Sequence, residues 1–344
     1  MDKSQVMEDP LVSVIIPTHN RPESLVETLK SVFAQTFQDF EIVLVNDAGI
    51  PVEEVIQPFL ESGKLTYIRN SKNKRLPGTR NIAIHNARGK YIAYLDDDDI
   101  FYPNHLEVLV NALEHSDSRI AYTDSNCRLF QNENGKDETV LVQPSYGYDF
   151  SKDLFLVSNY IPVLCIMHEK SCFDEVGYFD ENLSSHEDWE LWIRMSRHND
   201  FLHIKEITCE YVLSFEPDKM AKRQDEMLKT MIDIYERTEE LISDRPDIIE
   251  RRKNLILDSE NRFKYHTARS KQTNKTVPEE YILLGVNLYS SEVENVDILK
   301  RINRIKGYIS QKKLNLVRRI ISNEDFFSPF RDQMLDALNK MESF

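Results

Sequence analysis

The stretch "LVSVIIPTHNRPESLVETLKSVFAQ", residues 11–35, decides the fold class. Its first seven residues are almost continuously apolar and rich in β-branched side chains, which is typical of a strand buried on both faces of a parallel sheet. Leu25, Leu29, Val32 and Phe33 then recur at helical spacing, and Pro22 stands where the first turn of a helix accepts proline. The stretch therefore predicts a buried strand followed by a helix.

The same alternation continues along the first part of the chain. Further strands are predicted at 40–46, 65–70, 91–96 and 119–124, and further helices near 52–61, 79–87 and 103–113. Apolar strands that alternate with helices favour an α/β fold, in which a mostly parallel open sheet carries helices on both faces.

The alternation of strands and helices is interrupted twice. Residues 126–168 do not show it, and a β-hairpin is predicted about Asn134 and Gly135. Beyond residue 219 the pattern indicates only amphipathic helices, broken near 245–246, 276–278 and 328–329. The sequence thus predicts a catalytic-type α/β domain over 1–218 and an all-α C-terminal region over 219–344.

Composition limits the classes of function. The 344 residues are 41% hydrophobic and 29% charged, with a net charge of −15, which argues against a nucleic-acid partner. The four cysteines form no C-x-x-C pair, so reduced thiols are expected. No apolar signal core stands at the N-terminus and no run approaches the roughly 20 apolar residues of a membrane span. We expect a cytoplasmic protein.

Four consecutive carboxylates, Asp96 to Asp99, follow the predicted strand in "YIAYLDDDDIFYP", residues 91–103. Neighbouring like charges repel, so the cluster makes most sense beside a cation. Asp96 and Asp98 point the same way in an extended segment, and carboxylate oxygens suit Mg²⁺ or Mn²⁺. The alternative is an acidic loop in which Asp99 caps the next helix.

Polar residues follow three of the predicted strands. Pro17, Thr18, His19 and Asn20 follow the first strand, Asn46 and Asp47 the second, and Asp96 to Asp99 the fourth. In an open parallel sheet, ligands bind beyond these strand ends. No glycine-rich loop is available to hold a phosphate through backbone N–H groups, so a metal bridging protein and diphosphate is predicted instead.

These motifs, in this order, resemble family 2 glycosyltransferases, which are inverting enzymes with the A-type nucleotide-sugar transferase fold. The resemblance covers about residues 11–215 and is carried by "VSVIIPTHNRP", "VNDAG", "LPGTRNIAI", "LDDDDIFYP" and "HEDWELWIR". Asn46 stands where the family often has an acid, and "PGTRN" departs from its usual small-small-Arg-Asn. The remaining helical region is expected to be a C-terminal extension.

The resemblance implies a role for each matching residue. A nucleotide-diphosphate sugar, with UDP favoured, would be contacted by Pro17, Thr18, Asn20, Asp47, Arg80, Asn81, Asp96 and Asp97. Asp98 would hold the Mn²⁺ or Mg²⁺ ion. Asp188 would be the general base that activates the acceptor hydroxyl, with Glu187 and Trp189 beside the acceptor. The acceptor would be a glycan, a lipid-linked molecule or a cell-surface polymer.

The spacing of the residues around Asp188 can also be interpreted without the family resemblance. In a helix from about 186 to 198, Asp188, Leu191, Trp192 and Met195 share one face, so the carboxylate heads a core-facing stripe. The alternative for Asp188 is a capping box with Ser185, which has the required spacing. For Trp189 the alternative is an ordinary core residue.

The sequence also allows two other classes of function. A sugar nucleotidyltransferase or nucleotide-diphosphate hydrolase could share the sheet and an acidic metal site, but the nucleotidyltransferase should have a glycine-rich loop in place of "PTHNRP". A non-catalytic interaction protein could use a degenerate transferase domain. The processive-synthase signature Q-x-x-R-W is missing, so transfer of a single sugar is expected.

The C-terminal region contains a basic stretch, "RINRIKGYISQKKLNLVRRI", residues 301–320, without an acid. Its isoleucines recur at helical spacing beside Lys and Arg. Packing against neighbouring helices, beside an oligomer contact, is one interpretation. The other is a peripheral contact with the anionic inner face of the membrane.

Overall fold

The structure, a computed structural model, describes residues 9–133, 136–145, 147–214 and 217–270. It separates into two compact units, residues 1–214 and 215–344. The boundary predicted after residue 218 lies inside the first helix of the second unit, α8 (Pro217–Arg237). That unit also contains α9 (Pro246–Ser270) and a short 3-10 helix, η2 (Glu239–Ile242). The basic stretch 301–320 and the predicted breaks at 276–278 and 328–329 lie outside the described residues.

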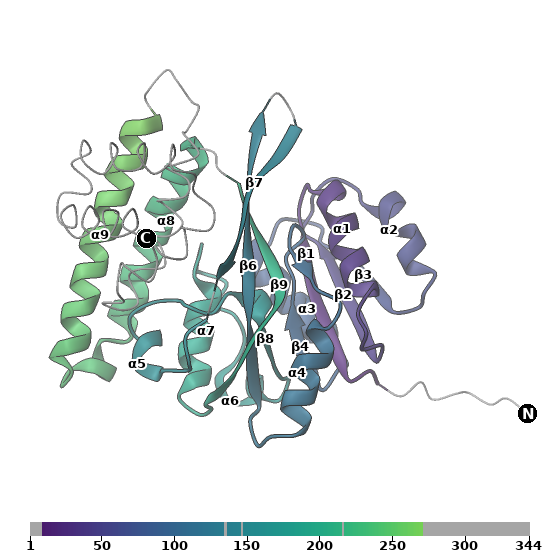
Figure 1. Cartoon of the computed structure of the whole chain (residues 1–344), viewed down its shortest axis with the longest axis horizontal. Helices are drawn as coiled ribbons and strands as arrows, with labels where there is room; N and C mark the ends of the chain where they lie inside the picture. The colour runs from purple at the N-terminus through teal and green to yellow at the C-terminus, as the bar shows by residue number, and fades with distance from the viewer. Residues whose placement is uncertain (1–8, 134–135, 146, 215–216, 271–344) are drawn as a thin grey trace, which may run out of the picture. The chain divides into compact units, whose positions relative to one another are not determined.

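The first unit confirms the predicted α/β fold (Figure 1). Its strands are β1 (Val12–Thr18), β2 (Phe40–Asn46), β3 (Leu65–Arg69), β4 (Tyr91–Tyr94), β5 (Ile100–Phe101), β6 (Ile120–Glu133), β7 (Lys136–Ser145), β8 (Ile166–Glu169) and β9 (Phe201–Ser214). Its helices are α1 (Pro22–Phe33), α2 (Glu53–Leu60), α3 (Arg75–Asn86), α4 (His105–Glu114), α5 (Lys152–Phe155), the 3-10 helix η1 (Val163–Cys165), α6 (Cys172–Val176) and α7 (Glu187–Ser196).

The strands of the described chain form one sheet in the order β3-β2-β1-β4-β8-β6-β9-β5, with β7 paired to β6. The first four strands are parallel, as predicted, and β1 and β2 are buried along their whole length because helices cover them. In the second half, β7 runs antiparallel to β6 as the predicted hairpin requires, and β5 and β8 also run antiparallel to their neighbours. The sheet is therefore mixed.

The predicted hairpin is present as β6 and β7, which project together from the sheet (Figure 1). All four cysteines are buried and free, as expected. Within the described ranges, no helix combines the length and apolar composition needed to cross a bilayer.

Candidate active site

Strand order places the candidate site. The chain passes from β1 outward through β2 to β3 and then returns to β4 on the other side of β1. The order therefore reverses between β1 and β4, and ligands of open α/β sheets bind at the carboxyl ends of such a pair. β1 ends at Thr18 and β4 runs into the Asp96 to Asp99 cluster.

The two strand ends are joined through Asp97. Its carboxylate accepts hydrogen bonds from the Thr18 hydroxyl at 2.8 Å and from the His19 backbone N–H at 3.2 Å. Arg21 Nη1 lies 3.0 Å from the second oxygen of Asp97. Burial raises the pKa of Asp97, and Arg21 opposes that rise. Asp97 therefore fixes the turn after β1 against the acidic loop.

Asp98 is the most accessible partner of Arg21. Arg21 Nη1 lies 2.7 Å from Asp98 Oδ2, the arginine side chain is 53% exposed and the Asp98 side chain is 30% exposed. Burial, with smaller contributions from the charges of Asp96 and Asp97, raises the pKa of Asp98 to about 6 despite the opposing charge of Arg21. Burial therefore disfavours the ionised form of Asp98, and the single charge of Arg21 offsets only part of that effect.

A second arginine joins the acidic loop to α7. The Arg80 guanidinium is 2% exposed and donates to Asp96 Oδ1 at 2.7 Å and to Glu187 Oε1 at 2.5 Å. Although burial lowers the pKa of Arg80, the charges of Asp96, Glu187 and Asp188 raise it above its ordinary value. One buried cation therefore holds the end of β4 beside the start of α7.

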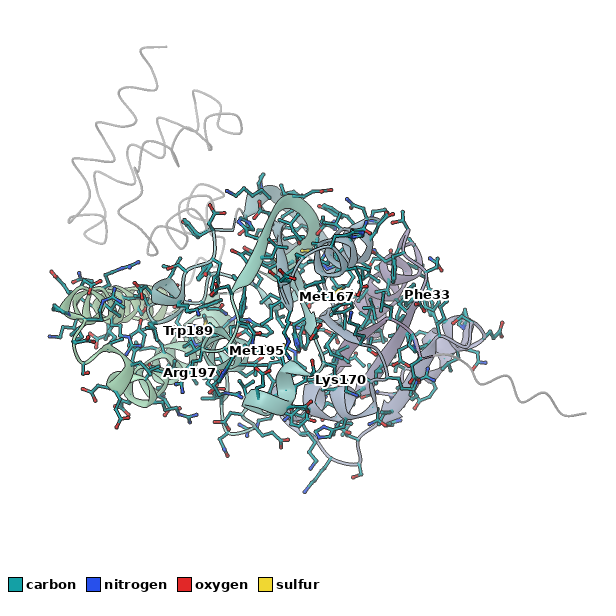
Figure 2. The ribbon with its side chains drawn as sticks, turned by 90° about the horizontal axis from the view of Figure 1, so that it is seen from below. Phe33, Met167, Lys170, Trp189, Met195 and Arg197 are labelled. Atoms are coloured by element: carbon teal, nitrogen blue, oxygen red, sulfur yellow. The ribbon has the colours of Figure 1, made fainter. Side chains whose placement is uncertain are left out.

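Asp188 lies in the first turn of α7 and is partly buried. Leu191, Trp192 and Met195, which share its predicted stripe, are buried in the core, and Figure 2 marks Met195 on this helix. Burial raises the pKa of Asp188, whereas Arg80, the Trp189 backbone N–H and Asn159 lower it.

The capping-box alternative places the N-cap at Ser185, one residue before the N-cap that the structure has. His186 is the N-cap residue of α7, in a left-handed conformation that forms no side-chain cap bond. Ser185 consequently lies outside the helix start, while Asp188 Oδ1 accepts a hydrogen bond from the N–H of Trp189 at 2.8 Å.

The turn after β2 lies against the turn after β1. Asp47 Oδ1 accepts from Asn70 Nδ2 at 2.8 Å and from the Lys74 N–H at 2.7 Å. Asn20 Oδ1 accepts from the Ile50 N–H at 2.8 Å. A Cβ on Gly49 would stand 2.8 Å from the Asn20 backbone nitrogen, so only glycine allows the two turns to approach this closely.

Backbone strain gathers around the same strand ends and helix starts. Among the described residues, the non-glycine positions with positive φ are Asn20, Ala48, Arg75 and His186. Asn20 and Ala48 follow β1 and β2, and Arg75 and His186 begin α3 and α7. Such conformations cost about 1–3 kcal/mol each and cluster at functional sites, where the surrounding contacts enforce them.

Several of the predicted site residues make contacts within the core of the fold. Asn81 is buried and holds the backbone of Phe179 from both ends of its carboxamide. Trp189 is 1% exposed, and its Nε1 donates to the Phe155 carbonyl at 2.7 Å, which favours the core role over the acceptor role (Figure 2). Pro17 is buried within β1, and Asp99 turns away to accept from the Val212 N–H.

Carboxylates of the acidic loop are held by arginines. Among the residues that the structure describes, no three His, Cys, Asp or Glu side chains gather so as to hold an ion. Asp96, Asp97 and Asp98 are instead paired with Arg80 and Arg21.

Two residues of the site were not assigned from the sequence. Arg21 belongs to the motif "VSVIIPTHNRP". Its position just after the first strand could have identified it as a charge partner of the acidic loop, because that loop follows a neighbouring strand. Asn159, whose Nδ2 lies 3.1 Å from Asp188 Oδ2, falls in a stretch without periodicity and gave no signal.

Solved structures with the same fold have been described at low sequence identity. TarS of S. aureus (residues 1–349) is 16% identical, with 96% of this chain and 90% of that chain covered and a TM-score of 0.51. The mannosyltransferase PcManGT from Pyrobaculum calidifontis, in complex with GDP-Man and Mn²⁺, is 12% identical, with 98% and 87% covered and a TM-score of 0.53. These likenesses support the A-type nucleotide-sugar transferase fold.

Proteins with similar sequences indicate the enzyme family. An uncharacterised glycosyltransferase of Bacillus subtilis is 32% identical over 203 residues, which are 59% of this chain and 73% of that protein. A Rickettsia conorii relative, also an uncharacterised glycosyltransferase, is 32% identical over 57% of this chain, which spans only 32% of that protein. The family model described as glycosyl transferase family 2 matches residues 13–167. The motif order, the fold and these relatives lead to one conclusion: the chain belongs to glycosyl transferase family 2.

Proposed function

We propose that this glycosyltransferase moves a single sugar from a nucleotide-diphosphate sugar to an acceptor hydroxyl, with inversion at the anomeric carbon and with the help of a divalent metal ion. One observation carries the proposal. The buried guanidinium of Arg80 joins Asp96, at the donor end of the sheet, to the start of the helix that bears Asp188. A group that binds the donor and a group that accepts a proton would thus be held in one rigid frame.

The donor would bind beyond the ends of β1, β2 and β4. Thr18 and Asn20 would line the nucleotide path, and Asp47 would face the base, as the family resemblance implies. TarS has been solved with UDP-GlcNAc and PcManGT with GDP-Man, so neighbours of this fold bind donors of both kinds. We favour a UDP-linked sugar for this chain.

Asp98 suits a divalent ion because its carboxylate is partly exposed and lies beside Asp96 and Asp97, and because burial and these two charges raise its pKa, which a bound cation would oppose. Its present partner, Arg21, is half exposed and can move aside. Asp98 would hold Mn²⁺ or Mg²⁺ together with diphosphate oxygens, and Asp96 would support it through its bond with Arg80. When bound, the ion supplies positive charge for the leaving diphosphate.

Asp188 would remove the proton from the attacking hydroxyl. Burial raises the pKa of its carboxyl group toward the range useful to a general base, while the Arg80 charge keeps it from rising further. A single displacement, with base and leaving group on opposite sides of the anomeric carbon, inverts the configuration. The acceptor would be a hydroxyl of a glycan, a lipid-linked molecule or a cell-surface polymer.

Calorimetric titration tests the donor half of the proposal. UDP and GDP are titrated into the full chain with Mn²⁺ and with a chelator, and the same is done for Asp98→Asn. We expect at least one nucleotide to bind wild type only with metal, and we expect Asp98→Asn to lose that dependence. A bound nucleotide at about a hundred times its dissociation constant should also stabilise the protein by about 2.7 kcal/mol. Equal binding with and without metal would contradict the metal assignment.

A further inference from the structure

We propose that Asn159 is the positioning residue for Asp188, a carboxamide able to pair with that carboxyl group both when it is ionised and when it carries a proton. The inference rests on the proposed role of Asp188 as general base. It goes beyond the motifs of the family resemblance, because Asn159 lies outside all of them.

Both oxygens of Asp188 are held in place. Oδ1 accepts from the N–H of Trp189 at 2.8 Å, and Oδ2 accepts from Asn159 Nδ2 at 3.1 Å. The first contact comes from the helix itself, and the second comes from the segment between α5 and η1. Two donors from different elements fix the plane of a carboxylate, which a single donor would leave free to rotate.

The other end of the Asn159 amide is unused. Asn159 Oδ1 is buried, and within the described part of the chain it has no hydrogen-bond partner. A buried carbonyl oxygen without a partner is costly and calls for an explanation. Turning the amide by half a revolution about its last bond exchanges Oδ1 and Nδ2, and this exchange breaks no hydrogen bond of Oδ1. The oxygen would then face Asp188.

Presenting Oδ1 in place of Nδ2 suits the change that a general base undergoes when it takes up a proton. During transfer the acceptor O–H bond breaks and its proton goes to Asp188, while the acceptor oxygen forms a bond to the anomeric carbon. The bond between the anomeric carbon and the diphosphate oxygen breaks, and the nucleoside diphosphate leaves with that electron pair. Asp188 thereby changes from a pure acceptor to a donor. An amide offers an acceptor to the new O–H as readily as it offered a donor to the carboxylate, whereas lysine could only donate.

The segment that carries Asn159 is tied down. The neighbouring Tyr160 hydroxyl accepts from the Ser151 N–H at 2.9 Å, and its ring packs on Phe155 with the ring centroids 4.6 Å apart. Trp189 Nε1 in turn donates to the Phe155 carbonyl. The buried Trp189 therefore docks the Asn159 segment onto the helix that bears Asp188, which gives this tryptophan a function other than acceptor contact.

Asp188 is also exposed to charges from other elements. Arg80 on α3, Asp96 after β4 and Glu187 on α7 all influence it electrostatically. The Asn159 hydrogen bond is one of the contacts that lower the pKa of Asp188. Removing it should therefore raise that pKa with the other three charges unchanged, and a second carboxylate in its place should raise it more.

A carboxyl NMR titration tests the inference without needing turnover. Protein labelled with ¹³C at the aspartate carboxyl groups is titrated as wild type, Asn159→Ala and Asn159→Asp, and the Asp188 signal is the one missing from Asp188→Asn. Asn104→Ala is the matched control, since Asn104 donates to Glu206 at 2.6 Å at an exposed position. We expect Asp188 to titrate at higher pH in Asn159→Ala, higher still in Asn159→Asp, and as wild type in Asn104→Ala.

Kinetics add a second readout. Release of UDP from UDP-glucose and UDP-GlcNAc in the presence of Mn²⁺ uses water as acceptor, and Asn159→Ala should lower kcat by up to about 10²-fold with an unchanged donor KM. Unshifted titration of Asp188 in both Asn159 variants would overturn the inference; if Asn159→Ala does not fold, the isosteric Asn159→Asp decides alone. Failure of wild type to release UDP would instead count against the proposed function and leave the NMR result valid.

Discussion

The two arginines of the site occupy contrasting environments. Arg21 is 53% exposed and pairs with Asp97 and Asp98, whereas Arg80 is 2% exposed and pairs with Asp96 and Glu187. A half-exposed cation can be displaced at little cost, because water solvates it in either position. A buried one cannot, because its carboxylates would be left uncompensated. The difference separates a charge that a metal ion can replace from a charge that is part of the frame.

The largest effect on stability should come from removing the buried cation. Arg80→Met leaves Asp96 and Glu187 without their partner and should cost about 3–5 kcal/mol, whereas Arg21→Met should cost at most about 1 kcal/mol. Denaturant unfolding followed by tryptophan fluorescence measures this, because both tryptophans of the chain, Trp189 and Trp192, lie on α7. Equal losses in the two variants would remove the distinction between the arginines.

A milder change sharpens the same comparison. Arg80→Lys keeps the charge, but a single ammonium cannot reproduce the fork that reaches Asp96 and Glu187 from different nitrogens. Loss of one hydrogen bond to a charged group should cost about 1.5–3 kcal/mol. The control Arg21→Lys should change the unfolding free energy by no more than about 0.5 kcal/mol. If Arg80→Lys is as stable as wild type, charge alone holds the frame.

The smallest expected effect is the contribution of Asp98 to the pH dependence of stability. Because burial raises the folded pKa of Asp98 to about 6, its ionised form opposes folding above that pH, and this penalty decreases progressively as the pH falls below about 6 toward the ordinary pKa of an aspartate. The thermal midpoint of wild type relative to Asp98→Asn should therefore rise from pH 7 to pH 5. If the thermal midpoints of the two proteins change with pH by the same amount, the pKa of Asp98 is not raised in the folded protein.

Much of this arrangement was predictable from local patterns. The period of the first two strands and the helix between them indicates the α/β fold, and the polar residues that follow β1, β2 and β4 indicate where the site lies. Asp188 could be predicted to face inward because its stripe of apolar neighbours recurs at helical spacing. Each of these signals lies within a short window of sequence.

Long-range pairs were beyond sequence reasoning. Arg80 and Glu187 are separated by 107 positions, and Asn159 and Asp188 belong to segments joined only by the fold. β8 is four residues long and lies in the stretch that lost its periodicity, so its antiparallel pairing with β4 and β6 had no local signal. Trp189 could not be assigned between acceptor and core, because its hydrogen bond to Phe155 depends on that same segment.

We expect Asp98, the partly exposed carboxylate beside Arg21, to bind the donor through the metal ion, and Asp188, on α7, to act as the general base. The most direct test measures metal-dependent UDP affinity and the rate of UDP release from a UDP-sugar in the same two variants. Asp188→Asn should keep its affinity and lose about 10²–10⁴-fold in rate, whereas Asp98→Asn should lose the metal-dependent affinity. Near wild-type turnover in Asp188→Asn would contradict the account and place the base elsewhere.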